Sequence, residues 1–246
     1  MANTPDTYAI AKMYKYLRVC DVGDALDAIG RPSICLMDPA IRPLFQGIKF
    51  WGPAVTQRAI PANKPMRPLS REEAILSHRL WFQEFPIKGW VTSVVKPGCV
   101  VVTDAHSCGE VGIWGSENSL GVMEAGAVGI VSDGYIRDTR ELFYTKTPVV
   151  FKTRGRTIIP GRCIFTDLNE PVGCGGVLVR PGDIVGCDDD GVVVVPAEVA
   201  EDVGKIASDI LIDDEKKRRA HYQKLGIPLD DTVDVALLEE FYKPWK

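Results

Sequence analysis

Apolar side chains recur at helical spacing near the start of the sequence. Four of them lie three or four residues apart: Val22, Ala25, Leu26 and Ile29. This spacing places them on one face of a helix, and the glycine that follows, Gly30, is a typical helix end. Asp21 stands before the run and is the expected N-cap. We therefore expect two short helices within residues 8–30, the second beginning after Asp21.

The middle of the chain contains short apolar runs bounded by glycine and proline, a pattern typical of buried strands. The predicted strands are Gly52–Thr56, Cys99–Asp104, Val128–Val131, Val149–Phe151, Gly176–Val179, Asp183–Val185 and Val192–Val195. No helical pattern separates the last three. Neighbouring strands joined by short turns pair antiparallel, so the sheet is expected to be antiparallel or mixed.

Helices are predicted around this strand-rich centre, at Arg71–Gln83, Ser116–Ala125 and from Ala197 to about Leu225. Helices packed against a sheet predict a layered α/β domain. The glycines at 126 and 129 follow a helix and precede a strand, which is the reverse of the order in a dinucleotide-binding fold. A nucleotide-binding fold is therefore not indicated.

Composition narrows the function classes. The 246 residues fit one globular domain, and the formal net charge of −4 gives no general attraction for nucleic acid. Apolar stretches such as Gly191–Val199 are shorter than the ~20 residues of a membrane span, and residues 1–21 contain no signal-peptide pattern. The basic run at 216–219 directly follows three acidic residues and is typical of a solvated helix face. We expect a cytoplasmic protein that binds neither nucleic acid nor a membrane.

The cysteines give no indication of a disulfide framework or a thiolate metal site. There are seven, an odd number, and no two have Cys-x-x-Cys spacing. They are expected to be reduced. The three histidines are far apart in the sequence, at 78, 106 and 221.

The segment Gly115-Ser116-Glu117-Asn118 begins a predicted helix, and Ser116 is a good N-cap. The first amides of a helix have no internal partner, so they can bind a carboxylate. About ten helical residues and six extended ones span comparable lengths of ~15 and ~20 Å. If the strand returns along its helix and turns at Asp133-Gly134, then Arg137 and Asp138 reach the same rim as the free amides.

These residue types suit a small oxo acid and a divalent cation. Arg137 can bind a carboxylate or enolate through its planar pair of donors, and Asp138 offers a hard oxygen ligand to Mg²⁺ or Mn²⁺. A metal bound to a 2-oxo acid stabilises the enolate that forms when a carbon–carbon bond breaks. Structural roles are the alternative: Asp138 also fits a helix-capping pattern, Arg137 an ion pair, and Ser116 a simple cap.

Residues Gly126 to Asp138, together with Gly115-Ser116, resemble the signature of the RraA-like family. That family includes the 4-hydroxy-4-methyl-2-oxoglutarate / 4-carboxy-4-hydroxy-2-oxoadipate aldolases and the regulator of ribonuclease E activity. Supporting segments lie at 22–26, 52–56, 180–183 and 189–196. The resemblance covers roughly residues 18–225 and is most specific in the Gly126–Asp138 block.

The resemblance implies a single swivelling β/β/α domain over residues 1–246, with a helical extension at about 1–18 and a tail at about 226–246. It implies a homotrimer or a dimer of trimers. It also implies divalent-metal-dependent retro-aldol cleavage that releases pyruvate, often with oxaloacetate decarboxylation. Asp138 would be the metal ligand, Arg137 a substrate contact, and residues 115–118 the amides that bind the pyruvyl carboxylate.

One position departs from the aldolase pattern, in which an aspartate precedes the Arg-Asp pair by twenty intervening residues. Ser116 stands at that place and cannot act as the carboxylate that orders a metal-bound water. Glu117 is one residue along, but a helical step of ~100° is expected to turn it elsewhere. The departure bears on the aldol step more than on metal or oxo-acid binding.

The leading hypothesis is a metal-dependent lyase that cleaves a 2-oxo acid carrying a second carboxylate. The alternatives are a non-catalytic regulator that binds ribonuclease E and, less supported, a methyltransferase, for which no glycine-rich cofactor loop is present. The proton donor stays open among Asp104, His106, Glu110, Glu117 and a metal-bound water.

Overall fold

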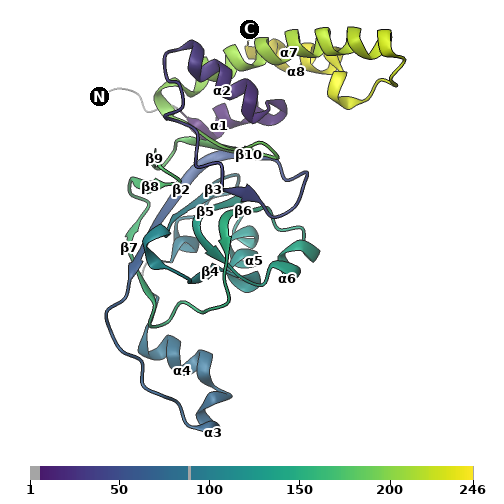
Figure 1. The fold of residues 1–246 in the computed structure, drawn as a ribbon. Coiled ribbons are helices and arrows are strands. Elements are labelled where there is room, and N and C mark those ends of the chain that lie inside the picture. Colours follow the sequence, from purple (N-terminus) through teal and green to yellow (C-terminus); the bar gives the residue numbers. More distant parts are fainter. Residues whose placement is uncertain (1–5, 88–89, 246) are drawn as a thin grey trace.

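The computed structural model describes residues 6–87 and 90–245. A nine-stranded mixed sheet forms the centre of the molecule (Figure 1). Its main path has the order β1-β6-β5-β3-β2-β10-β11, with β4 attached to β5 and β7 attached to β2. Strands β8 and β9 form a separate antiparallel pair.

The strands of the large sheet are β1 (Arg42–Pro43), β2 (Phe50–Pro61), β3 (Val100–Asp104), β4 (Gly112–Trp114), β5 (Gly129–Ile136), β6 (Val149–Arg154), β7 (Cys163–Leu168), β10 (Ile184–Asp188) and β11 (Gly191–Val195). The separate pair is β8 (Val172–Cys174) and β9 (Val177–Val179). Strands β2, β3, β5 and β6 pair parallel, whereas β10 pairs antiparallel with both β2 and β11. The predicted mixed sheet is thus confirmed.

The helices are α1 (Thr7–Ala11), α2 (Val19–Ala28), α3 (Arg71–Ala74), α4 (Ser77–Glu84), α5 (Ser116–Glu124), α6 (Thr139–Tyr144), α7 (Ala200–Leu225) and α8 (Val235–Tyr242). Short 3-10 turns connect several of them, including one at Lys12–Tyr16. Helices α3 and α4 lie at the opposite end of the molecule from α7 and α8 (Figure 1).

Buried apolar side chains form three clusters that hold these elements together. The first joins the N-terminal helices to α7, α8 and the β10-β11 hairpin. The second packs α5 and α6 against one face of the parallel strands through residues such as Val122, Leu142 and Ile130. The third fills the opposite face beside β8 and β9. Because the parallel strands are covered on both faces, they appear in the sequence as continuous apolar runs.

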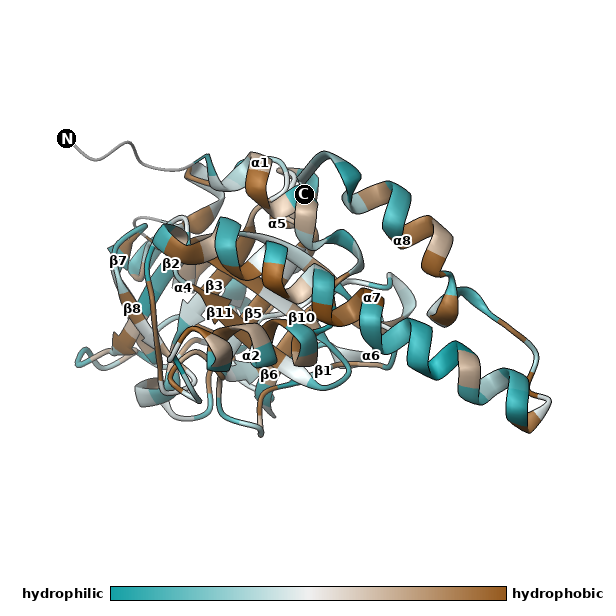
Figure 2. Ribbon diagram, turned by 90° about the horizontal axis from the view of Figure 1, so that it is seen from above, coloured by the Kyte–Doolittle hydropathy of each residue, from teal (hydrophilic) through white to brown (hydrophobic). Residues whose placement is uncertain are grey.

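Helix α7 has one apolar face that packs on the body and a polar part that extends beyond it (Figure 2). Val203, Ala207 and Leu211 are buried. Lys217 in the basic run forms an ion pair with Asp213 at 2.5 Å, as expected of a solvated helix face. Within the described residues, no helix is both long and apolar enough to cross a bilayer.

Two predicted helices differ from those observed. Helix α2 begins at Val19 rather than after Asp21, so the N-cap prediction for Asp21 was wrong. Asp21 is the third helical residue and accepts the backbone N–H of Arg18 at 2.9 Å. The helix predicted at 71–83 is broken into α3 and α4: a capping box of Ser70 and Glu73 begins α3, and Leu76 leaves the helical conformation before α4 begins at Ser77.

The turn predicted at Asp133-Gly134 is also absent, because β5 continues to Ile136. Its last two residues pair with β4, an additional short strand that prolongs the sheet at this edge. The register between β5 and β6 shifts between Ser132 and Tyr135. The chain therefore leaves the sheet directly before Arg137.

The predicted C-terminal tail is structured rather than extended. Within it, α8 packs against α7, and Leu238 and Tyr242 are buried in the first cluster. The N-terminal segment likewise contributes Met13 and Tyr14 to the same cluster. Both ends of the chain thus belong to one helical layer.

Candidate functional site

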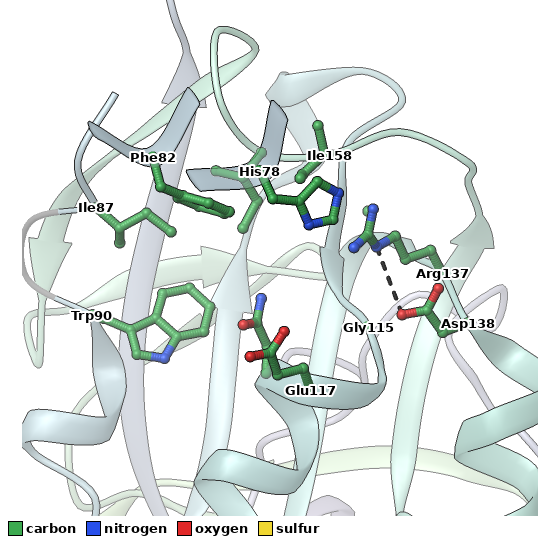
Figure 3. A pocket seen from close by; sticks show the side chains of 12 residues that line it. His78, Phe82, Ile87, Trp90, Gly115, Glu117, Arg137, Asp138 and Ile158 are labelled. Carbon is green, nitrogen blue, oxygen red and sulfur yellow. Dashed lines mark ion pairs between the residues drawn. The ribbon is translucent and has the colours of Figure 1, made fainter. Parts of the chain in front are cut away.

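A small cavity of 230 Å³ lies at the N-terminal end of α5 (Figure 3). Pockets that bind drug-sized ligands usually range from about 300 to 1,000 Å³, so this one suits a small molecule. Its polar lining comes from Gly112, Gly115, Glu117, Asn118, Arg137, Asp138 and His78. Its apolar lining comes from Phe82, Ile87, Trp90, Ile158 and Ile159.

The end of β5 carries Arg137 and Asp138 to the start of α5, as the sequence predicts. The Arg137 backbone N–H donates to the carbonyl of Trp114 at 2.9 Å, which extends the β4-β5 pairing by one residue. The Ser116 backbone nitrogen lies 3.1 Å from Asp138 Oδ2. The strand therefore returns along its helix, and residues 115–118 and 137–138 meet.

Asp138 occupies the N-cap position of α6 in a left-handed conformation, with φ of 55° and ψ of 37°. Its side chain does not cap α6. Instead, Oδ2 accepts hydrogen bonds from the Ser116 backbone N–H at 3.1 Å and from Ser116 Oγ at 3.2 Å. Among the described residues, none donates to Oδ1. The capping alternative therefore does not explain this carboxylate.

The Asp138 side chain fits a divalent cation by its chemistry and position. It is about one-third exposed, at 34%, and one oxygen stays available while the other is held by Ser116. Mg²⁺ commonly takes one or two protein carboxylates and completes its shell with water and substrate. The donor set is thus suited to a hard metal that keeps most of its coordination for other ligands.

Arg137 directs its guanidinium into the cavity, toward His78 (Figure 3). Its Nε lies 3.7 Å from Asp138 Oδ2, a loose ion pair. Its two terminal nitrogens donate to no described residue. The structural ion-pair alternative thus accounts for only part of this side chain, and the paired terminal donors remain free for a carboxylate.

The first turn of α5 differs from prediction in its cap. Gly115, not Ser116, is the N-cap, and Ser116 is the first helical residue. The Ser116 amide donates to Asp138 Oδ2, so it is already paired, and its expected contact with a substrate carboxylate stays a prediction. The amides of Glu117 and Asn118 donate to no described residue, while the Asn118 side chain donates to the Ile113 carbonyl at 3.0 Å.

Gly115 is required by this close approach. A Cβ at this position would lie 2.6 Å from Asp138 Oδ2 and 3.2 Å from Arg137 Cγ. The first contact is shorter than Cβ atoms show, and the second is tight. The glycine therefore allows the Asp138 carboxylate to reach the start of α5.

Among the four candidate proton donors, Glu117 alone lines the cavity. Its carboxylate faces the space between Trp90 and Arg137 (Figure 3), so the expectation that the helix turns it elsewhere was wrong. Glu110 instead forms two hydrogen bonds with the Arg156 side chain, at 2.9 and 2.8 Å, and this pairing lowers the pKa of Glu110 to about 2. Asp104 and His106 lie in a separate cluster.

That cluster joins Asp104, His106 and Asp133, whose potential ligand atoms lie within 4.8 Å of one another. Nδ1 of His106 is 3.0 Å from Asp104 Oδ1 and 3.5 Å from Asp133 Oδ2. Two ligands of one ion at about 2.1 Å each would be separated by comparable distances, so a divalent cation could be held here.

The carboxylates of this cluster already have protein partners. Both oxygens of Asp133 accept buried backbone N–H groups, from Ala105 at 2.8 Å and Gly175 at 3.1 Å. Asp104 Oδ2 accepts from Arg58 at 2.9 Å. Burial is the main cause that raises the pKa of Asp133, and the nearby Asp104 charge raises it further. The two backbone hydrogen bonds act in the opposite direction and lower it in part. The cluster joins the end of β3 and strand β5 to the turn between β8 and β9, and it does not line the cavity that contains Asp138.

The apolar wall of the cavity was not predicted. His78 and Phe82 are four residues apart on α4, a spacing that places two side chains on one helix face. That spacing was visible in the sequence, but nothing there shows that α4 and Trp90 lie opposite Arg137.

The sequence is similar to proteins of one known family. The model of the RraA-like family, described as Aldolase/RraA, matches residues 19–194. Over 127 residues the chain is 38% identical to a protein named as a candidate 4-hydroxy-4-methyl-2-oxoglutarate aldolase from Halalkalibacterium halodurans, covering 51% of this chain and 59% of that protein. Over 228 residues it is 29% identical to protein DlpA of Legionella pneumophila, covering 92% of this chain and 33% of DlpA.

The chain thus spans a third of the length of DlpA and less than two thirds of the Halalkalibacterium protein. Among solved structures, Streptomyces coelicolor RraAS2, described as an unusual member of the RNase ES inhibitor RraA protein family, has 26% identity and a TM-score of 0.70, with 86% of this chain and 98% of that one covered. An uncharacterized protein from Pseudomonas syringae has the same fold, at a TM-score of 0.70 and 22% identity. Because the family model covers most of the sequence, the chain belongs to the RraA-like family.

Proposed function

We propose that the cavity binds a 2-oxo acid together with Mg²⁺ or Mn²⁺, and that the protein is a carbon–carbon lyase that releases pyruvate or decarboxylates oxaloacetate. One observation carries the proposal: the terminal nitrogens of Arg137, which have no described partner, and the carboxylate of Asp138 line one small cavity at a helix N-terminus. The aldolase name of the Halalkalibacterium relative supports the same reaction class.

In this proposal Asp138 is the protein ligand of the metal, and Ser116 orients it through two hydrogen bonds. A divalent cation bound there would supply Lewis-acid polarisation of the substrate keto group. Arg137 would hold the substrate carboxylate through its two terminal nitrogens. The unpartnered amides of Glu117 and Asn118 would add to the positive potential at the same end of α5.

Glu117 is the residue proposed to move a proton. Its carboxylate faces the cavity beside Arg137, so it can take a proton from a substrate hydroxyl and return one to the enolate carbon (Figure 3). In the aldolase pattern an aspartate occupies the position of Ser116. Glu117 offers a carboxylate one residue later, within the same cavity.

The test is metal-dependent turnover. With Mg²⁺ or Mn²⁺, purified protein should release pyruvate from a 4-hydroxy-2-oxo acid, decarboxylate oxaloacetate, and exchange the methyl protons of pyruvate in D₂O. Arg137→Ala and Asp138→Ala should abolish all three. Matched controls are Arg31→Ala and Asp213→Ala, which remove an arginine and an aspartate from surface ion pairs elsewhere. Full activity in either cavity variant would end the proposal.

A second function is regulation of a ribonuclease E-type enzyme without catalysis. The likeness to Streptomyces coelicolor RraAS2, named within an RNase ES inhibitor family, favours it. Inhibition of ribonuclease E cleavage by wild type and by Arg137→Ala alike, without metal-dependent turnover of any oxo acid, would support this alternative over the lyase.

The homotrimer or dimer of trimers implied by the family stays a prediction. Light scattering coupled to size-exclusion chromatography would measure the mass in solution. A mass of three or six chains of 27.0 kDa would confirm it.

A further inference from the structure

The cavity has two chemically different sides (Figure 3). Arg137, Asp138 and Glu117 lie on one side, and the side chains of Phe82, Ile87 and Trp90 face them from the other. The polar side holds what a pyruvyl group requires: a guanidinium for its carboxylate and a hard oxygen ligand for a metal. The rest of a bound substrate would therefore meet the apolar side.

Trp90 and Ile159, on the apolar side, are held in place by packing. The Trp90 ring lies 5.3 Å from that of Trp114 and 5.2 Å from that of Phe165, centroid to centroid. Ile159, on the loop between β6 and β7, is 3% exposed. Phe82 projects from α4, a helix that lies outside the sheet. A preformed apolar surface favours a ligand group that is itself apolar, because burial removes apolar area from water.

The charged residues around the cavity also favour an apolar substituent over a second carboxylate. A second substrate carboxylate is best held by a cation of its own. Among the described lining residues Arg137 is the one guanidinium, and the other basic side chain is the imidazole of His78. Two arginines in the adjoining hollow are each held by a glutamate through two hydrogen bonds: Arg67 by Glu73 at 2.9 and 2.8 Å, and Arg156 by Glu110 at 2.9 and 2.8 Å. Arg162, also in that hollow, donates to the Ile158 carbonyl at 3.1 Å.

We infer that the preferred substrate is a 4-hydroxy-2-oxo acid with a single carboxylate, whose substituent at C4 is aromatic or otherwise apolar. This inference rests on the proposed lyase function and replaces the diacid of the leading sequence hypothesis. Phe82 and Trp90 are its specificity-determining residues.

The reaction is a retro-aldol cleavage and balances without an oxidant or reductant. The C4 hydroxyl gives its proton to Glu117 and becomes the carbonyl of an aldehyde. The C3–C4 bond breaks, and its electron pair forms the enolate of pyruvate. Glu117 returns the proton to C3, so the products are pyruvate and an apolar aldehyde.

The experiment compares kcat/KM for two substrates that share the pyruvyl half: 4-hydroxy-2-oxo-4-phenylbutanoate and 4-hydroxy-4-methyl-2-oxoglutarate. In wild type the phenyl substrate should be favoured by about 10-fold or more, the range that a modest difference in pocket contacts provides. Phe82→Ala should remove most of that preference. Phe143→Ala, which truncates an exposed aromatic ring on α6, should leave it unchanged.

A second variant should reverse the substrate preference by adding a charge. Phe82→Arg adds a guanidinium to the apolar wall, so the diacid should become the better substrate. Binding is a readout independent of turnover: in isothermal titration calorimetry, phenylpyruvate should bind wild type about 10-fold more tightly than 2-oxoglutarate, and Phe82→Ala should lose that difference.

Exchange of the pyruvate methyl protons tests the proposed function alone. Pyruvate has no C4 substituent, so its exchange does not depend on the apolar side of the cavity. Exchange that requires Arg137 and Asp138, combined with a diacid preference that Phe82→Ala does not alter, would overturn the inference and leave the lyase intact. Absence of exchange and of cleavage for both substrates would overturn both.

Discussion

Strand β5 and its end carry two aspartates, five residues apart, whose surroundings are opposite. Asp133 lies within the strand, is buried, and has a backbone N–H on each oxygen. Asp138 lies just beyond the strand, is one-third exposed, and has Ser116 on one oxygen with the other free. Asp133 belongs to the Asp104-His106-Asp133 group that could hold a metal ion, whereas Asp138 lines the cavity that also holds Arg137.

The difference shows how a carboxylate becomes available for chemistry. A buried carboxylate must have hydrogen-bond donors, and each donor that the fold supplies occupies a position that a ligand could otherwise use. Asp133 satisfies that requirement and thereby connects β5 to the residue after β3 and to the turn between β8 and β9. Asp138 is held from one side only, so it is oriented while one oxygen stays accessible. We therefore expect substitution of Asp133 to lower stability and substitution of Asp138 to lower activity.

Replacing Asp133 with alanine should have the largest effect, on stability. It leaves two buried N–H groups without acceptors, each worth about 1–3 kcal/mol, so the free energy of unfolding should fall by about 2–6 kcal/mol. Urea denaturation measures this change. The control Asp230→Ala removes an exposed carboxylate that also accepts a backbone N–H, and should lower stability by about 1 kcal/mol or less. Equal losses in the two variants would contradict the assignment.

Replacing Asp138 with alanine should affect activity rather than stability. Removing a residue that hydrogen-bonds to a metal ligand lowers metal affinity or activity by about 10- to 100-fold. Removing the ligand itself should therefore lower metal-dependent kcat/KM by about 100-fold or more. Calorimetric titration with Mn²⁺ should show the same loss of affinity. If Asp133→Ala, measured where it is still folded, lost Mn²⁺ binding and Asp138→Ala kept it, the roles of the two aspartates would be reversed.

Replacing Gly115 with alanine should displace the Asp138 carboxylate, because the new Cβ would lie 2.6 Å from Oδ2. A displacement of about 1 Å in an active site can lower rates 100-fold, so we expect kcat/KM to fall about 10- to 100-fold. Gly121→Ala is the control in the same helix, since its Cβ would meet nothing within 4 Å. That control should keep full activity and gain up to about 1 kcal/mol of stability.

Replacing Ser116 with alanine should have a smaller effect. It removes the Oγ hydrogen bond to Asp138 and keeps the one from the backbone. Mn²⁺ affinity should fall by about 10-fold or less. An unchanged affinity would show that the backbone N–H alone orients the carboxylate.

The smallest effect is the pH dependence that Asp133 contributes to stability. Burial raises the pKa of Asp133 above its ordinary value of 3.8, so the folded state binds this proton more tightly than the unfolded state. The stabilisation is present below pH 3.8 and is lost as the pH rises through the folded-state pKa. The unfolding free energy of wild type, relative to Asp133→Asn, should therefore fall as the pH rises from 3.8 through the folded-state pKa. A difference that is constant across this range would contradict the raised pKa.

Local patterns in the sequence were sufficient to predict most of the scaffold. The runs that became β3, β5 and β11 are apolar because both sheet faces are covered, and the approach of Arg137 and Asp138 to the start of α5 followed from element lengths. Differences from prediction arose where a partner far along the chain decided the outcome. Pairing with β4 removed the turn expected at Asp133-Gly134, and Asp138 took the amide of Ser116.

The amino-acid sequence by itself therefore determined the elements, the mixed sheet and the two residues central to the proposed site, because these depend on spacing along a short stretch of chain. Tertiary structure decided which oxygens of the two aspartates accept hydrogen bonds, which carboxylate shares a cavity with Arg137, and that an apolar wall from α4 and Trp90 faces it. Those properties depend on packing between segments distant in the sequence, and no local periodicity records such contacts.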